Sequence, residues 1–225
     1  MRKTFLLGAA ALTAALFGAP RAQAQSLRFG IKGGANLANL AGNLTNQNQY
    51  KNRFGFHGGA LLNIGLVDDD FFAIQPEVLY SQKGFNYQGG SLTVGSSTFA
   101  STGGVRYDYI DVPVLLRLKT NGVFFELGPQ YSYLLQVSSD RSITQNGQVV
   151  AGSQGQVTNL DNVRRNELGY AAGLGYQSNA GPMLGLRYNG AFTDFARDGY
   201  SNNEFRNARN SVFQLYVGYV LGGSK

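Results

Sequence analysis

Residues 107–119 read YDYIDVPVLLRLK, and from Ile110 onward the apolar residues recur at every second position. One face of this segment carries Ile110, Val112, Val114, Leu116 and Leu118, and the other carries Asp111, Pro113, Leu115, Arg117 and Lys119. An alternation of period two predicts an extended strand with one apolar face. From Ile110 to Lys119 the segment therefore predicts a β-strand whose charged side chains all lie on the face opposite the apolar one.

The same alternation recurs in seven further segments, at 27–38, 53–66, 71–83, 123–136, 167–176, 184–189 and 213–221. Most of them reach the length of about 9–11 residues that a tilted strand needs to cross the hydrocarbon layer of a membrane. Eight is the smallest common strand number of outer-membrane barrels. We therefore predict an all-β fold, an eight-stranded antiparallel up-and-down transmembrane β-barrel.

The connections between these segments alternate in length. Long connections are expected at 39–52, 84–104, 138–164 and 193–209, and short ones at 67–70, 120–122 and 177–181. Outer-membrane barrels have short periplasmic turns and long extracellular loops, and Asn121-Gly122 is a strong hairpin-turn signal. Pro76, Pro113 and Pro129 lie inside predicted strands, where a proline cannot donate to the ladder, so we expect bulges or local breaks there.

The first residues have the pattern of a secretory signal. Arg2 and Lys3 precede an apolar run at 5–17 and the small-residue motif Ala22-Gln23-Ala24. An anchoring helix needs about 20 apolar residues, and this run is shorter. We therefore expect a cleavable signal peptide at 1–24 and a single outer-membrane β-barrel domain at 25–225, exported through the inner membrane.

Composition narrows the function classes. Without Arg2, Lys3 and Arg21, 16 basic residues remain against 13 acidic ones, so the expected mature charge is +3 rather than +6. These basic residues form no stripe, which disfavours nucleic acid as a partner. The chain has no cysteine, which excludes disulfides and thiolate metal sites.

The faces opposite the apolar ones carry charged residues that we expect to line the barrel interior. A cation facing mid-membrane lipid costs about 2–4 kcal/mol, which favours the inward orientation. The interior of an eight-stranded barrel is just wide enough for side chains, so this set predicts a filled lumen rather than a pore. The set, a lumen polar network, comprises Arg28, Lys32, Glu77, Asp111, Arg117, Glu126, Glu167 and Arg187.

Several segments resemble the PorT-like family of bacterial outer-membrane β-barrels, and the resemblance covers nearly all of 27–221. Its most specific motifs are Gln75-Pro76-Glu77, Val112-Pro113 and Gly128-Pro129, within segments such as AIQPEVLYSQKGF and FFELGPQYSYLL. The resemblance implies an integral outer-membrane protein, and the founding member is associated with protein secretion across that membrane. In place of the usual terminal aromatic residue the chain ends in Gly-Gly-Ser-Lys, so we expect the barrel-insertion machinery to recognise Tyr219 and Leu221.

Other candidate sites have simpler interpretations. His57, the only histidine, is expected to point inward, and no G-x-S-x-G motif supports a catalytic role for it. Asp68-Asp69-Asp70 resembles a hard-cation ligand set but is expected to be a solvated periplasmic turn. Gly173-x-Gly175 lies in a predicted strand and is expected to relieve crowding rather than bind a dinucleotide.

The long connections are rich in Asn, Gln, Ser, Thr and Gly, so they are either binding surfaces or disordered spacers. Their basic residues are candidate contacts for lipopolysaccharide phosphates: Lys51, Arg53, Arg164, Arg165, Arg206 and Arg209.

The leading hypothesis is a non-enzymatic outer-membrane protein with a structural or interaction role and no cofactor or metal. Its expected partners are outer-membrane lipid and, during assembly, the insertion machinery, whereas secretion or surface partners stay unidentified. Three competing functions remain open: a small-solute or secretion-associated porin-like protein, an exported lipocalin-like carrier, and an outer-membrane lipid-modifying enzyme.

Overall fold

The computed structural model describes residues 26–42, 44, 47–66, 71–156, 163–194, 196 and 207–221. The expected signal peptide, the Asp68-Asp69-Asp70 turn and Arg206 lie outside these residues. Within the described part of the chain, no helix combines the length and the apolar character needed to span a bilayer.

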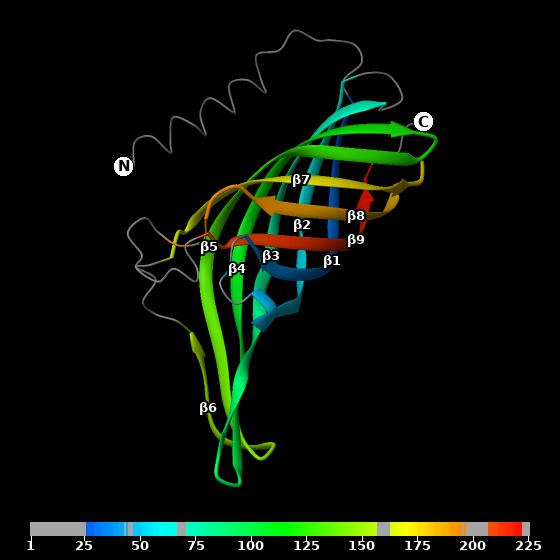
Figure 1. Ribbon diagram of the computed structural model, residues 1–225. Helices are drawn as coiled ribbons and strands as arrows, with labels where there is room; N and C mark the ends of the chain where they lie inside the picture. Colours follow the sequence, from blue (N-terminus) through cyan, green and yellow to red (C-terminus); the bar gives the residue numbers. More distant parts are fainter. Residues whose placement is uncertain are drawn as a thin grey trace.

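Eight antiparallel strands close into a ring, which confirms the predicted fold class (Figure 1). In ring order they are β1 (Leu27–Ala41), β2 (Tyr50–Gly65), β3 (Phe72–Val94), β4 (Ser97–Thr120), β5 (Val123–Gln145), β7 (Asn166–Gln177), β8 (Pro182–Ala191) and β9 (Arg209–Val220). The pairing of β9 with β1, for example Ala35 with Leu215, closes the barrel. A short 3-10 helix, η1 (Gln47–Gln49), leads into β2.

The two faces of the strands divide as the alternation predicts. On β4, Val114, Leu116 and Leu118 are exposed while Leu115 and Arg117 are buried. The other ring strands expose apolar side chains in the same way, such as Leu186 on β8 and Leu215 on β9. The barrel therefore has an apolar outer surface, and its polar side chains point into the lumen.

The three short connections are present. β4 and β5 are joined by Asn121-Gly122, whose φ angles of 49° and 82° are both positive, as a type I′ hairpin turn requires. The other two join β2 to β3 and β7 to β8 at the same end of the ring. We call this end periplasmic and the opposite end outer, following the rule for outer-membrane barrels.

Two of the predicted long loops are largely β-structure instead. β3 and β4 continue as a hairpin to a turn at Gly95, and β5 forms a second hairpin with β6 (Gln148–Gln156), turning at Asn146-Gly147. These extensions form one outer sheet in the order β3–β4–β5–β6, made of residues 85–94, 97–106, 138–145 and 148–156. Figure 1 shows it projecting from the outer end of the ring.

The extension of these strands escaped prediction for a physical reason. Alternation marks a strand when lipid contacts one face and a packed interior the other. Beyond the membrane both faces meet water, so polar residues such as those of 138–142 occupy successive positions.

The strand prolines interrupt the ladder without shifting it. Two residue pairs are missing beside each proline: in β2–β3 at Pro76, in β3–β4 at Pro113 and in β4–β5 at Pro129. The register is the same on both sides of each gap, because a missing N–H removes hydrogen bonds but need not move the strand. The expected local breaks are present, whereas the bulges lie elsewhere, one of them beside Asp108 and Tyr109.

Candidate functional site: the lumen network

The barrel lumen contains two clusters of ion pairs, and every strand of the ring contributes polar side chains to the surrounding network. The periplasmic cluster is centred on Glu77, and the outer cluster on Lys83. All eight residues of the predicted lumen set are buried. They fall into two groups, because Asp111 and Glu167 belong to the outer cluster and the other six lie nearer the periplasmic end.

Glu77 on β3 accepts hydrogen bonds from three side chains on three strands. The Arg187 guanidinium donates to both of its oxygens, Nη1 to Oε2 at 2.8 Å and Nη2 to Oε1 at 2.9 Å. Lys32 Nζ lies 3.1 Å from Oε2, and Gln75 Nε2 donates to Oε1 at 2.8 Å. A two-pronged arginine–carboxylate pair is the strongest form of such an interaction and has a defined geometry.

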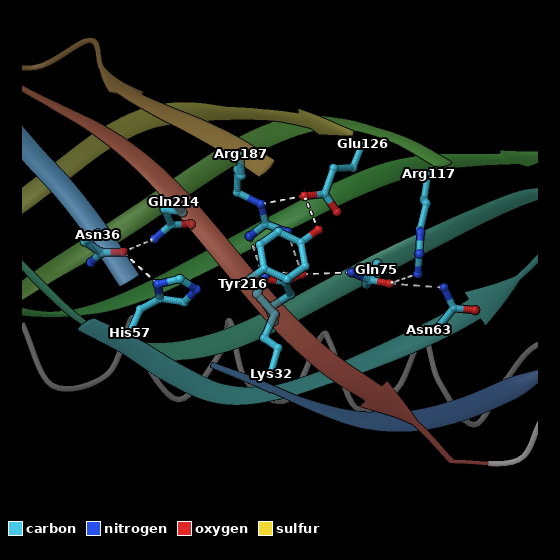
Figure 2. Close-up of polar contacts among 11 residues, drawn as sticks. Lys32, Asn36, His57, Asn63, Gln75, Arg117, Glu126, Arg187, Gln214 and Tyr216 are labelled. Atoms are coloured by element: carbon cyan, nitrogen blue, oxygen red, sulfur yellow. Dashed lines mark hydrogen bonds and ion pairs between the residues drawn. The ribbon is translucent and has the colours of Figure 1, made fainter. Parts of the chain in front are cut away.

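Arg187 also binds a second carboxylate and so links opposite walls of the barrel. Its Nε donates to Glu126 Oε1 at 2.6 Å, and the Tyr216 hydroxyl donates to the same oxygen at 3.0 Å. Lys32 Nζ lies over the Tyr216 ring, 3.8 Å from its centroid. Figure 2 shows these side chains meeting in the middle of the lumen from β1, β5, β8 and β9.

Glycines on β7 leave room for this packing. A Cβ atom on Gly173 would lie 2.8 Å from Glu126 Oε1, and one on Gly175 would collide with the Phe124 ring. These contacts agree with the expectation that Gly173-x-Gly175 relieves crowding.

The periplasmic end of the lumen is built around Arg117. Its Nη1 donates to Gln75 Oε1 at 2.9 Å, and its guanidinium lies over the Phe124 ring, 3.8 Å from the centroid. Asn63 Nδ2 donates to the same Gln75 oxygen at 3.2 Å, and Arg28 Nη2 donates to Asn63 Oδ1 at 3.3 Å. The sequence predicted Arg28 and Arg117 as lumen residues, but Asn63 and Gln75, whose side-chain amides bind them, were not in the predicted set.

A layer of uncharged groups separates the two clusters. His57 is 2% exposed, and its Nδ1 lies 2.6 Å from Asn36 Oδ1. The Asn36 amide nitrogen donates to Gln82 O and Ser81 Oγ, so Asn36 Oδ1 is the acceptor and His57 Nδ1 carries the proton. Ser81 therefore bonds Asn36 rather than His57, so these two residues do not form a nucleophile–base pair.

The outer cluster contains one cation and two carboxylates. Lys83 Nζ lies 2.9 Å from Asp111 Oδ1 and 3.0 Å from Glu167 Oε1, and it donates to Ser132 Oγ at 3.2 Å. Asn210 donates to the second Glu167 oxygen. Lys83 was absent from the predicted set, although its spacing of six from Glu77 places it on the same face of β3.

Apolar clusters pack at both ends of the lumen. At the outer end, Tyr50 and Phe85 pack edge to face with ring centroids 5.1 Å apart, against Tyr107, Leu134 and Val137. At the periplasmic end, Leu61, Phe124, Met183, Tyr216 and Val220 form a second cluster. In the described part of the chain, no group of three or more His, Cys, Asp or Glu residues is arranged to hold a metal ion.

The described basic residues considered for lipopolysaccharide lie at the outer end of the ring, on or beside different strands. Arg53 donates to Asn86 Oδ1 at 3.0 Å and lies 3.6 Å from Asp140, and Arg209 lies 2.9 Å from Asp194. Lys51 is exposed on β2, and Arg164 and Arg165 directly precede β7.

Known structures with a similar fold are distant relatives in sequence. They include Ail, the attachment invasion locus protein of Yersinia pestis (13% identity, TM-score 0.42, 86% of this chain and 98% of that one). They also include Neisserial surface protein A (17%, 0.37, 85% and 96%) and OprG of Pseudomonas aeruginosa (11%, 0.35, 88% and 97%). These sequence identities and TM-scores are too low to indicate a function. The fold is assigned from the strand pairing of this chain itself.

The chain matches no curated protein. Residues 22–197 match the family described as outer membrane protein beta-barrel domain. Because this match covers well over half of the sequence, the chain belongs to that family of outer-membrane β-barrels.

Proposed function

We propose that the protein is a closed, non-conducting outer-membrane barrel with a structural or interaction role at the cell surface. The observation that carries this proposal is the network of Glu77, Arg187 and Glu126, whose ion pairs run from β3 through β8 to β5 with fully buried side chains. Three strands that lie apart in the ring are joined across the lumen. Ion passage would require these pairs to separate in a low-dielectric interior.

The outer sheet supports an interaction role. It adds two paired hairpins beyond the length that crossing a membrane requires. Several of its apolar side chains, including Leu92, Val94 and Val149, are more than half exposed. Apolar side chains displayed on an ordered, water-facing sheet suit contact with another molecule.

Conductance across planar bilayers tests the closed lumen. We expect neither the wild-type protein nor Glu126→Ala to produce a stable ion current. Glu126→Ala should nevertheless unfold at a temperature several degrees lower, because Arg187 Nε and the Tyr216 hydroxyl lose their buried acceptor. A large current from either protein would contradict the proposal and favour a small-solute or secretion-associated porin.

The carrier and enzyme hypotheses have their own tests. A lipocalin-like carrier needs an apolar lumen and would be released from cells by salt or sonication, whereas we expect this protein to be extracted only by detergent. A lipid-modifying enzyme would lose its activity in His57→Ala. The contact of His57 Nδ1 with an amide oxygen favours a packing role for this histidine.

The lipid partner proposed for the outer rim is lipopolysaccharide. Arg53 and Arg209 are already paired with carboxylates, so Lys51 and Arg165 are the stronger candidates for phosphate contact, and Arg164 adjoins Arg165 in the chain. Replacing Arg164 and Arg165 with glutamine should reduce the lipopolysaccharide that co-purifies with the protein, measured by mass spectrometry. Unchanged co-purification would contradict this contact, and Arg141→Gln in the outer sheet serves as the control.

The PorT-like resemblance belongs to the same proposal. Its motif Gln75-Pro76-Glu77 supplies two side chains of the periplasmic cluster, so the motif is compatible with a role in closing the lumen. Recognition of Tyr219 and Leu221 by the barrel-insertion machinery, and any secretion or surface partner, are part of the same proposal.

A further inference from the structure

We propose that the periplasmic end of the lumen binds a small oxyanion, a phosphate or a carboxylate, on the buried, unpaired Nε–Nη2 edge of the Arg117 guanidinium. This site is distinct from the ion pairs that close the lumen. The charge surrounding Arg117 and the hydrogen bonding of its guanidinium support such a site.

Arg117 is a buried cation in a region whose carboxylates are bound to other cations. Among the described residues of the periplasmic cluster, the buried carboxylates are Glu77 and Glu126. Glu77 is shared by Lys32 and Arg187, and Glu126 binds Arg187. Burying a cation without a bound counter-charge is costly, so this region favours a bound anion.

Arg117 has the geometry to bind that anion. It is 2% exposed, and its Nη1 is used by Gln75. Its Nε and Nη2 have no hydrogen-bond partner in the part of the chain that the structure describes. These two nitrogens share one edge of the guanidinium, where two parallel N–H groups match two oxygens of a phosphate or carboxylate.

The surroundings hold this edge in place at the periplasmic end. The Phe124 ring covers one face of the guanidinium, and Gln75 fixes the opposite end of the fork. In Figure 2, Arg117 lies with Gln75 and Asn63, apart from the Arg187–Glu126 pair. Arg117 is four residues before the Asn121-Gly122 turn, so an anion would enter from the periplasm.

Glu126 is the competing partner within the chain. Glu126 and Arg117 lie opposite each other in the β4–β5 register. Glu126 Oε2, like Arg117 Nε and Nη2, lacks a hydrogen-bond partner among the described residues. A water molecule between these two groups, or a carboxylate of Asp68-Asp69-Asp70, would satisfy Arg117 without any ligand. The experiment must therefore separate a free anion from both.

Thermal unfolding of the full chain in detergent, with sodium phosphate replacing sodium chloride at constant ionic strength, makes this test. We expect the unfolding temperature of the wild-type protein to rise with inorganic phosphate and to saturate, as binding to the folded state requires. Arg117→Gln should weaken the apparent phosphate affinity at least tenfold. Arg117→Lys, which keeps the charge but loses the two-pronged edge, should be intermediate.

Arg141→Gln is the matched control, because this exposed arginine lies in the outer sheet, at the opposite end of the barrel. It should keep the full phosphate response. A wild-type protein with no saturable response, or an Arg117→Gln protein with the wild-type response, overturns the proposal. A response that appears only after Asp68, Asp69 and Asp70 are changed to asparagine would show that the chain's own carboxylates fill the site, which also overturns it. If Arg117→Gln does not fold, the ³¹P resonance of phosphate decides instead: the wild-type protein should broaden it more than Arg117→Lys does, and equal broadening by the two proteins overturns the proposal.

Discussion

Replacing Glu77 with alanine should lower the free energy of unfolding by about 3–5 kcal/mol, the typical cost of removing one partner from a buried ion pair. Glu77 accepts hydrogen bonds from both Arg187 and Lys32, and all three side chains are fully buried. Without this carboxylate, Lys32 would lose its ion pair and Arg187 would keep only Glu126. We expect this to be among the most destabilising single changes in the lumen.

Denaturant-induced unfolding from phospholipid vesicles, followed by tyrosine fluorescence and by the shift of folded barrel on unheated gels, measures this effect. Asp140→Ala is the control, because Asp140 lies in the outer sheet, is paired with Arg53 and has a side chain that is 48% exposed. Exposed pairs contribute about 0–1 kcal/mol, so this variant should unfold almost like the wild type. Equal stability of Glu77→Ala and wild type would mean that the network does not hold the barrel together.

Replacing Leu186 with arginine should destabilise the folded barrel by about 2–4 kcal/mol, because it places a cation on the lipid-facing surface near the middle of the membrane. Leu186 lies halfway along β8, is 57% exposed, and pairs with Leu174 and Leu215 on the neighbouring strands. The same unfolding experiment in vesicles measures the change.

Leu92→Arg provides a control of nearly equal exposure. Leu92 is 65% exposed but lies in the outer sheet, where its surroundings are water. Its replacement should change the stability by no more than about 0.5 kcal/mol. If both arginine variants were as stable as the wild type, the apolar surface of the ring would not be facing lipid, and the exported soluble carrier would become the better interpretation.

Both predictions concern the barrel wall, whose two faces could be assigned without coordinates. The alternation on 107–119 predicted Arg117 inward and Leu116 outward, as the structure has them. Because a charge that faces lipid is costly, charged residues avoid every second position of a strand that crosses the membrane. The same applies to the strand number and to the tight turn at Asn121-Gly122. These features depend on neighbouring residues and on the solvent that each face meets, so they can be predicted from the local sequence.

The partners within the lumen depended on the tertiary structure. Glu77 and Arg187 are 110 residues apart, and they meet only because the closed ring brings the inner faces of β3 and β8 together across the lumen. Arg117 and Glu126, by contrast, are direct partners in the β4–β5 register, yet Glu126 binds Arg187 on β8 instead. Ring closure and the stagger of the strands decide such choices, and neither leaves a signal in any single segment.

The sequence by itself determined an outer-membrane barrel of eight strands, with its charges turned inward, because the membrane imposes a period-two pattern on every strand that crosses it. The tertiary structure decided that these charges form two separate clusters, that the amides of Gln75 and Asn63 position the arginines, and that polar segments beyond the membrane form an ordered sheet. Each of these features depends on contacts between residues distant in sequence. The outer sheet has water on both faces and the lumen is enclosed on all sides, so in neither place does the spacing of residues along a strand indicate their partners.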